Sequence, residues 1–222
     1  MTVPTNAFQT YASIGNREDL SDTIYNISPT DTPFVSMCDK VTASSVYHEW
    51  QTEALAAVDV TNYKIEGDDA AAIAVTATVR IGNRCQISDK TIVVTGTQEV
   101  ISKAGRKSEL AHQIALKGKE LKRDMEAIIT RNQASVTGSD GVARKLGSVE
   151  SWLTSNDSRG AGGSDGGFSA GNTVAATNGT QRPFTEILLK TVLQLAYTSG
   201  GDPDTIMVGP FNKQQFSTFT GN

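Results

Sequence analysis

The chain has 222 residues, of which 38% are hydrophobic and 20% charged, and its formal net charge is −4. A negative total argues against a protein whose whole surface binds nucleic acid, because such proteins carry a dominant basic patch. Two cysteines, Cys38 and Cys85, exclude a disulfide framework and a four-cysteine zinc site; we predict two buried thiols in a reducing compartment, with a single bridge as the alternative.

Signals for secretion and membrane insertion are missing from the sequence. The start, MTVPTN, has neither the basic residues nor the apolar run of a signal peptide. No uninterrupted apolar run reaches the roughly 18 residues of a membrane span. We therefore expect a protein that is made and assembled in the cytosol.

The first segment, residues 1–44, shows no sustained hydrophobic period. Pro29 and Pro33 push the residues before them toward extended geometry. One short helix is predicted over Asp19–Ile24, and the rest is interpreted as an extended arm that is too short to bury its own apolar groups. The apolar side chains of this arm that are candidates for subunit contacts are Ile24, Ile27 and Phe34.

After the arm, the hydrophobic period changes to two. Ala72–Ile81 alternates larger apolar residues with small or polar ones, which is typical of a half-buried strand. Val46–Leu55 and Gln86–Val94 are also predicted strands, because they are rich in β-branched and aromatic residues. Polar residues 59–71 separate the first two strands. The pattern predicts a long β-hairpin with a mobile tip, followed by one more strand.

Residues 97–133 follow the helical period, and Gly105 is expected to interrupt them. Thr95 followed by Gln98 matches a capping box at the start. A restart at Ser108 predicts a helix to Asn132, about 37 Å long at 1.5 Å per residue. The apolar face of this helix is formed by Leu110, Ile114, Leu121, Met125 and Ile128.

The remaining sequence alternates turns, a low-complexity stretch and short elements. Residues 134–153 are predicted to be a turn-rich return segment, and the glycine-rich residues 154–182 a loop or disordered insert. Residues 183–200 carry an apolar helical face. A short strand over Thr205–Val208 is expected to follow, and Asn212–Phe219 is interpreted as the start of another helix.

Charge is distributed unevenly along the chain. Residues 1–96 carry a net charge of −6, residues 97–133 carry +3, and residues 134–222 carry −1. An acidic arm and hairpin beside a basic helix favour pairing, within one chain or between copies; an ordinary solvated helix is the alternative. The charged candidates for subunit contacts are Lys64 at the hairpin tip and Arg106, Lys107, Lys119, Lys122 and Arg123 of the basic segment.

Residue patterns for catalysis are weak. The two histidines, His48 and His112, lack ligand partners at the spacing of a metal site, so both are interpreted as structural or exposed. Residues 162–166 match G-x-S-x-G, but the flanks are glycine-rich loop and no histidine follows Ser164. We expect no enzyme, no cofactor and no metal; a hydrolase using Ser164 is the least favoured alternative.

The order of these elements resembles the major capsid proteins of tailed bacteriophages, with the Hong-Kong-ninety-seven-like fold. Residues 20–34, LSDTIYNISPTDTPF, look like the arm of one branch of phage major head proteins. SKAGRKSELA at residues 102–111 and GKELKRD at residues 118–124 resemble the same branch at its spine helix. PFNK at residues 210–213 fits its axial domain.

The resemblance implies an α+β fold with four structural parts around a glycine-rich loop at residues 154–182. Residues 1–44 would be the N-terminal arm and residues 45–96 the extended loop. Residues 97–153 would form the peripheral domain with its spine helix, and residues 183–222 would begin the axial domain. The family is longer, so we expect the gene product to continue beyond this chain.

The function implied is a structural subunit of an icosahedral or prolate phage head. It would assemble with itself into hexamers and pentamers around double-stranded DNA, which it would contact without sequence specificity. Scaffold, portal and decoration proteins are further possible partners, and no membrane is involved. The protein would be located in the virion, after assembly in the host cytoplasm. The alternative is another self-assembling phage structural protein, of tail or surface-layer type.

Overall fold

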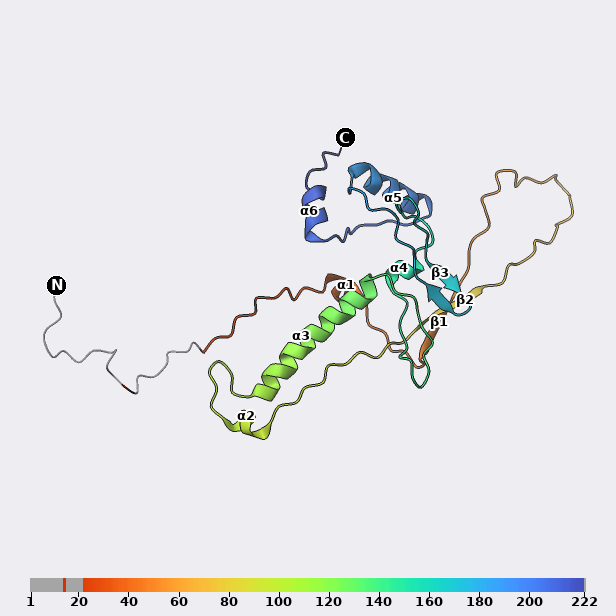
Figure 1. The fold of residues 1–222 in the computed structure, drawn as a ribbon. Coiled ribbons are helices and arrows are strands. Elements are labelled where there is room, and N and C mark those ends of the chain that lie inside the picture. The colour runs from red at the N-terminus through yellow and green to blue at the C-terminus, as the bar shows by residue number, and fades with distance from the viewer. Residues whose placement is uncertain (1–13, 15–21, 222) are drawn as a thin grey trace. The chain divides into compact units, whose positions relative to one another are not determined.

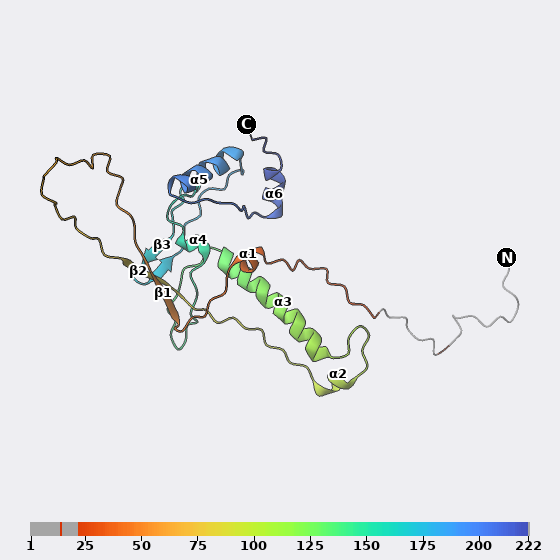
Figure 2. The same cartoon turned by 180° about the vertical axis from the view of Figure 1, so that it is seen from behind.

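A computed structural model describes residue 14 and residues 22–221, and it combines helices with short antiparallel strands (Figures 1 and 2). The mixed α+β composition predicted from the sequence is confirmed. The elements, in chain order, are α1 (Pro33–Met37), β1 (Tyr47–Thr52), β2 (Val79–Arg84), α2 (Gly96–Val100), α3 (Glu109–Thr130), α4 (Val149–Trp152), β3 (Gly167–Ser169), β4 (Asn172–Val174), α5 (Glu186–Thr198) and α6 (Pro210–Phe216).

The described residues divide into two compact units. The first contains the described residues up to Asp31 together with Asp89–Arg123, and the second contains Thr32–Ser88 and the described residues from Asp124 onward. Helix α3 begins in the first unit and ends in the second.

The first unit is organised by the caps of α2 and α3. The Thr95 hydroxyl accepts a hydrogen bond from the Gln98 N–H (3.4 Å), so α2 begins where the sequence predicts. Gly105 has φ of +75°, a left-handed conformation that glycine adopts readily. The Ser108 hydroxyl then accepts from the Ala111 N–H (3.1 Å) at the start of α3. The predicted break and restart are therefore confirmed.

A glutamate of α2 also caps α3. The Glu99 carboxylate accepts hydrogen bonds from the N–H groups of Glu109 (2.9 Å) and Leu110 (3.1 Å). These N–H groups have no partner within the helix, so the carboxylate satisfies them and also complements the positive end of the helix dipole. The hydrogen bonds, first that of Ser108 and then that of Leu110, lower the pKa of Glu99.

Strands β1 and β2 form an antiparallel sheet in which Tyr47 lies opposite Arg84 and Thr52 lies opposite Val79. The predicted hairpin is thus confirmed at its base. The predicted strand over Ala72–Ile81 is wrong over most of its length, because β2 begins only at Val79. Residues 53–78 leave the sheet as a wide loop (Figure 1), and alternation alone does not make a strand where the opposite chain forms no ladder.

The predicted third strand, over Gln86–Val94, is also wrong. These residues run as an extended segment with no strand assignment. A β-branched sequence needs hydrogen-bonding neighbours before it becomes a strand, and the β1–β2 sheet has two strands only in the described part of the chain.

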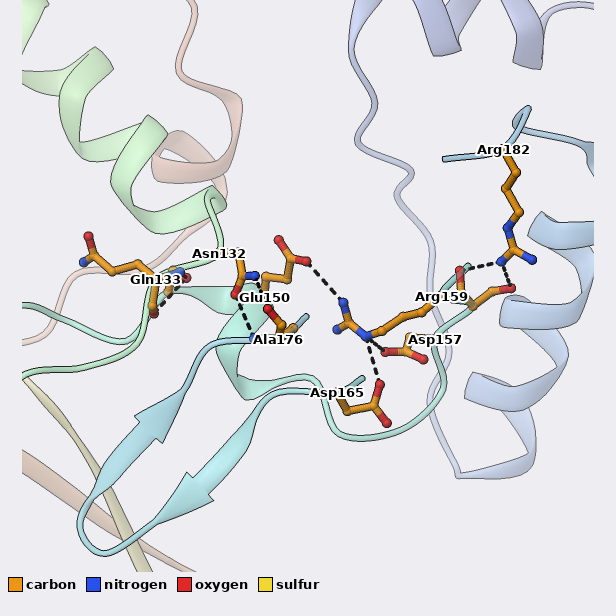
Figure 3. A network of polar contacts seen from close by, with 10 residues as sticks. Asn132, Gln133, Glu150, Asp157, Arg159, Asp165, Ala176 and Arg182 are labelled. Atoms are coloured by element: carbon orange, nitrogen blue, oxygen red, sulfur yellow. Dashed lines mark hydrogen bonds and ion pairs between the residues drawn. The ribbon is translucent and has the colours of Figure 1, made fainter. Parts of the chain in front are cut away.

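The interior of the second unit is polar. Among residues 14 and 22–221, the one buried hydrophobic side chain is Ala176, whereas several small polar side chains are buried. The Ser148 hydroxyl accepts from the Gln133 N–H (2.7 Å), and the Asn132 amide pairs with the backbone of Ala176 through bonds of 2.6 and 2.9 Å (Figure 3). Hydrogen bonds therefore position the return segment against the glycine-rich segment.

The glycine-rich residues 154–182 were predicted to be a loop or a disordered insert, and most of them do form a loop, but one with defined pairing that the sequence analysis did not predict. They contain the hairpin of β3 and β4 and an additional bridge between Ser164 and Thr177. Gly160 and Gly179 pack backbone to backbone: a Cβ built on Gly160 would lie 2.1 Å from the Thr180 carbonyl oxygen, and one on Gly179 would lie 2.2 Å from that of Gly160. Glycine is required here for close packing.

Arg159 holds this segment to α4. Its guanidinium lies 3.2 Å from the Glu150 carboxylate, 2.8 Å from that of Asp157 and 2.9 Å from that of Asp165 (Figure 3). The Arg159 side chain is 14% exposed, whereas the Asp165 side chain is 42% exposed, so the ion pairs lie at the edge of the packed region. Burial, together with the neighbouring Asp165 carboxyl, raises the pKa of Asp157. One guanidinium thus forms ion pairs with three carboxylates.

Aromatic rings join the hairpin base to the same region. The Trp50 ring of β1 lies 5.3 Å from the Trp152 ring of α4, which stacks at 5.5 Å on the Phe168 ring of β3. The Arg84 guanidinium lies 4.1 Å from the centre of the Tyr47 ring. Side chains of β1, α4 and β3 therefore fix the base of the hairpin, while its loop extends beyond these contacts.

Helix α5 lies within the predicted residues 183–200, and α6 overlaps the helix start predicted at Asn212–Phe219 but begins at Pro210 and ends at Phe216. The ring of Phe219, just after α6, lies 5.2 Å from that of Phe184 and 5.6 Å from that of Phe216. The predicted strand over Thr205–Val208 is wrong: these residues form no strand, and Ile206 and Met207 remain 43% exposed.

Within the arm, the described residues form one short helix, which the sequence analysis did not predict. Helix α1 is capped by Glu126 of α3, whose two carboxylate oxygens accept from the N–H groups of Phe34 and Val35, at 2.8 Å each. Of the predicted helix over Asp19–Ile24, the part before Asp22 lies outside the described residues, and Asp22–Ile24 is not helical.

Candidate subunit-contact surfaces

Large apolar side chains are exposed along most of the described chain. The hairpin loop carries the most exposed group: Leu55 (98%), Val58 (91%), Ile73 (91%) and Val75 (93%). Soluble monomers rarely expose so many apolar residues in one segment, and such surfaces mark sites of association. The other exposed apolar residues of the loop are Val60, Tyr63 and Ile65.

The arm candidates differ in exposure. Ile24 is 49% exposed and Ile27 is 95% exposed, so both are available for contact with another molecule. Phe34, in contrast, is half-buried in α1 and lines a groove. The Ile24 side chain lies near Gly105, where a Cβ would be 3.0 Å from it.

An open groove of about 770 Å³ lies in the second unit. Its lining is mostly apolar, and α1, the end of α3, α4 and the extended segment before α6 contribute to it. Cys38 is exposed at this groove and Cys85 is half-buried; both are free thiols. The prediction of buried thiols is therefore wrong, because neither cysteine lies in an apolar interior. The apolar lining residues are Phe34, Met37, Val149, Leu153, Met207 and Val208.

The basic residues of α3 fall into two groups. Lys117 pairs with Glu120 (2.8 Å), and Arg106, just before the helix, pairs with the buried Glu109. Lys119 and Lys122 are exposed, and within the described chain neither makes an ion pair. The same holds for exposed Lys107 and Arg123. The structure thus leaves part of the predicted basic face available.

Hydrogen bonds favour the ionised form of the Glu109 carboxyl group. Its carboxylate accepts a bond from the Gln113 amide (2.8 Å) and a bond from Arg106. The Gln113 bond, followed by the Arg106 bond, lowers the pKa of Glu109, and burial opposes the shift. The Arg106 charge is therefore used within the subunit.

The hairpin loop is acidic where α3 is basic. Glu66, Asp68 and Asp69 are exposed near its tip, as is the predicted contact residue Lys64. The Asp59 carboxylate accepts from the hydroxyl (2.6 Å) and N–H (2.8 Å) of Thr61, and these two bonds lower its pKa. These bonds favour the charged form of Asp59.

The described residues do not form an arrangement typical of a catalytic or metal-binding site. Ser164 is exposed and its backbone bridges to Thr177, which differs from the strand–turn–helix setting of a nucleophile elbow. His48 is exposed and His112 is half-buried. No group of three or more His, Cys, Asp or Glu side chains is arranged to hold a metal ion within residues 22–221, and no helix there is long and apolar enough to cross a membrane.

Sequence reasoning missed the groove and the cap that Glu126 provides. The groove arises from four segments that are distant in sequence, so no local pattern reveals it. Glu126 could have been noticed as an acidic residue on the predicted helix, but only the fold places it beside the N-terminus of α1.

Comparison with known proteins identifies two similarities. The sequence model of the family described as SU10 major capsid protein matches residues 3–222. The major capsid protein of Escherichia phage Phieco32 is 31% identical over 252 aligned residues, which cover 97% of this chain and 70% of that protein.

Proposed function

The chain belongs to the SU10 major capsid protein family, a family of structural proteins, and on that premise we propose how it builds a shell. Copies assemble into hexamers and pentamers, which close into an icosahedral or prolate head around double-stranded DNA. Assembly takes place in the host cytoplasm, and the finished protein resides in the virion. The DNA is contacted without sequence specificity.

One observation carries this proposal: the described part of the chain leaves many large apolar side chains exposed, while its buried side chains are mostly polar. Each 100 Å² of apolar surface removed from water is worth roughly 2.5 kcal/mol before the cost of ordering the contacting segments. A subunit of this kind gains most of its apolar burial from neighbours. Closed symmetric assembly supplies such neighbours, because each copy gives and receives the same contacts.

Each segment of the chain has its own role in assembly. Residues 1–44 serve as the arm, and residues 45–96 as the loop that reaches a neighbouring copy. Residues 97–153 serve as the peripheral domain, and residues 183–222 as the start of the axial domain. The apolar contact residues proposed for the arm are Ile24, Ile27 and Phe34.

Ion pairs between copies align the contacting segments. The acidic hairpin tip lies against the exposed cations of α3 in another copy, and Lys64 meets an acidic group there. Exposed ion pairs contribute only about 0–1 kcal/mol each, but they recur at each subunit contact of a shell. The basic residues proposed for these contacts are Arg106, Lys107, Lys119, Lys122 and Arg123, of which Arg106 is also paired with Glu109 within the subunit.

Deleting residues 1–44 tests this function. We expect the truncated protein to remain soluble, with the helical signal of α3 in circular dichroism, and to lose the closed shells that the whole chain forms in electron micrographs. Shells of normal size and yield from the truncated protein would refute the proposed role of the arm. Tubes or sheets from the whole chain would favour the tail or surface-layer alternative.

A further inference from the structure

One carboxylate oxygen of Asp157 is buried without a hydrogen-bond donor. The Arg159 Nε atom lies 2.8 Å from this oxygen, Oδ2, but without the geometry of a hydrogen bond. The Nε–H group instead donates to the Asp165 Oδ1 atom, at 2.9 Å (Figure 3). A carboxylate oxygen that is removed from water without a donor is costly, and buried polar atoms of this kind are rare in folded proteins. The Asp157 oxygen therefore needs a hydrogen atom from another source.

The charges around Arg159 are also unbalanced. Helix α4 contributes the Glu150 carboxylate, 3.2 Å from the guanidinium, and the segment before β3 contributes those of Asp157 and Asp165. If all three were ionised, three negative charges would face one positive charge. Carboxylates that share a site repel each other, and the repulsion favours protonation of one of them. We call these four residues the Arg159 cluster.

Arg182 is a second cation near Asp157, and both residues line the same groove. Its guanidinium donates hydrogen bonds of 2.7 Å to the hydroxyl and the carbonyl oxygen of Ser158. Within the described part of the chain it forms no ion pair with Asp157. Arg182 therefore does not supply the donor that Asp157 lacks.

A proton on Asp157 accounts for both features. It turns the Oδ2 atom into a donor, and the Asp165 carboxylate lies within hydrogen-bonding distance as the acceptor. Burial first, and then the hydrogen bond with Asp165, raise the pKa of Asp157 above its ordinary value of 3.8. The same proton removes one of the three negative charges that face Arg159.

We propose that Asp157 and Asp165 share one proton, and that this proton holds the glycine-rich residues 157–165 against α4. When it leaves, the two carboxylates repel each other and both require Arg159. The contact between Arg159 and Glu150, the longest of the three at 3.2 Å, is then lost, and the segment separates from α4. Because the pKa of Asp157 is raised in the folded subunit, the stabilisation is fully present below about pH 3.8 and is lost as the pH rises through the folded-state pKa.

The tryptophans report the state of the Arg159 cluster. Trp152 lies on α4, two positions after Glu150, and its ring lies 5.3 Å from that of Trp50. These are the two tryptophans of the chain. The Trp152 ring also stacks at 5.5 Å on Phe168 of the glycine-rich segment, so separation of that segment from α4 changes its surroundings. Loss of the proton is therefore expected to change the intrinsic fluorescence.

The experiment uses dispersed subunits of the whole chain with His48→Gln as the parent. The substitution is needed because the His48 ring lies 6.1 Å from the Trp50 ring, and a change in its charge would also affect the fluorescence. Asp157→Asn keeps a hydrogen-bond donor for Asp165 but has no proton to lose. Asp140→Asn, at an exposed aspartate outside the cluster, is the matched control. Fluorescence and thermal unfolding are measured in steps from pH 3 to pH 8.

We expect the parent and Asp140→Asn to show a fluorescence transition with a midpoint above pH 3.8, and Asp157→Asn to lack it. Above the transition, Asp157→Asn should unfold at a temperature about 3 °C or more higher than the parent, because a neutral side chain no longer repels Asp165. Below the transition, the two should unfold within about 1 °C of each other. A simple ion pair between Asp157 and Arg159 predicts the opposite, a destabilised Asp157→Asn.

Three results would overturn the inference: no transition in the parent, the same transition in Asp157→Asn, or an Asp157→Asn protein less stable than the parent at pH 8. All three would leave the proposed function intact, because the subunits are dispersed throughout. If Asp157→Asn does not fold, carbon-13 NMR of the aspartate carboxyl groups in the parent decides. Asp157 must then titrate with a midpoint above 3.8, and a midpoint at or below that value would refute the inference.

Discussion

Ser135 and Thr173 exchange hydrogen bonds: the Thr173 hydroxyl accepts from the Ser135 N–H (2.8 Å), and the Ser135 hydroxyl accepts from the Thr173 N–H (2.7 Å). Both residues are buried, and they lie 38 positions apart in the sequence. The exchange joins the segment after α3 to strand β4. It satisfies two buried N–H groups without any apolar contact.

Removing one hydroxyl of this exchange should destabilise the subunit. Thr173→Val keeps the side-chain shape but leaves the Ser135 N–H without a partner, which costs about 1–3 kcal/mol in the free energy of unfolding. Urea denaturation of dispersed subunits measures the change. Thr42→Val, at an exposed threonine, is the matched control and should change the free energy by less than about 0.5 kcal/mol. Equal effects of the two substitutions would contradict the structural role of the exchange.

Gly160 is predicted to be intolerant of any side chain. A Cβ there would lie 2.1 Å from the Thr180 carbonyl oxygen, so Gly160→Ala should force backbone movement and cost about 1–3 kcal/mol or more. Gly141→Ala is the control, because nothing lies within 4 Å of a Cβ at that position. Thermal unfolding compares the two variants. A Gly160→Ala protein as stable as Gly141→Ala would mean that the glycine-rich segment is not packed as described.

The cap on α1 can be tested through Glu126. Glu126→Ala removes the acceptor for the N–H groups of Phe34 and Val35, and loss of a helix cap costs about 0.5–2 kcal/mol. We expect faster amide exchange in α1, with α3 still helical. Glu120→Ala, on the same helix but paired with Lys117, should leave exchange in α1 unchanged. If both variants left α1 equally protected, the cap would have no role.

The exposed cations of α3 should matter for assembly more than for folding. Lys119→Gln with Lys122→Gln removes two contacts of up to about 1 kcal/mol each, which should raise the protein concentration for half-maximal assembly by about threefold to thirtyfold. Lys145→Gln with Lys213→Gln, at two exposed lysines outside the arm and the loop, changes the net charge equally and should have little effect. Light scattering measures assembly, and added salt should narrow the difference between the two variants. Identical assembly curves would place the contact elsewhere.

Acid should weaken the start of α3 through Glu109. Its pKa is lowered in the folded protein, first by the Gln113 hydrogen bond and then by Arg106, from an ordinary value of 4.5. The folded state therefore binds its proton less readily than the unfolded state does. The resulting stability is fully present well above pH 4.5 and is lost as the pH falls through the lower, folded-state pKa. Urea denaturation across pH 3–6 should show a smaller pH dependence for Glu109→Gln than for the parent, and equal pH dependences would contradict this assignment.

The sequence predicted the long helices α3 and α5 well because their signals are local. The apolar period of α3, the Thr95 cap and the restart at Ser108 each depend on a few neighbouring residues, and the structure confirms all three. The base of the hairpin was predicted because its two strands, β1 and β2, follow one another in the chain. The proposed domain division and the subunit-contact residues are not tested by a single chain, and they stay predictions.

Prediction from sequence was wrong where long-range contacts decide the structure. The short hairpin within residues 154–182, which were predicted to be a loop or a disordered insert, was missed because glycine is common both in flexible segments and at close contacts. Only the neighbouring backbone shows that Gly160 and Gly179 permit close packing. The strand over Ala72–Ile81 was predicted from its alternation, but a strand also needs a covered face and a paired neighbour. The groove that Phe34 lines could not be predicted, since its walls come from separate segments.

Sedimentation of the purified chain, with electron microscopy of the fractions, tests the central claim most directly. The account predicts closed isometric or prolate particles far larger than one subunit. A well-behaved monomer of 23.6 kDa, with an intact mass equal to that of the whole sequence, would contradict the claim that this chain gains its apolar burial from copies of itself.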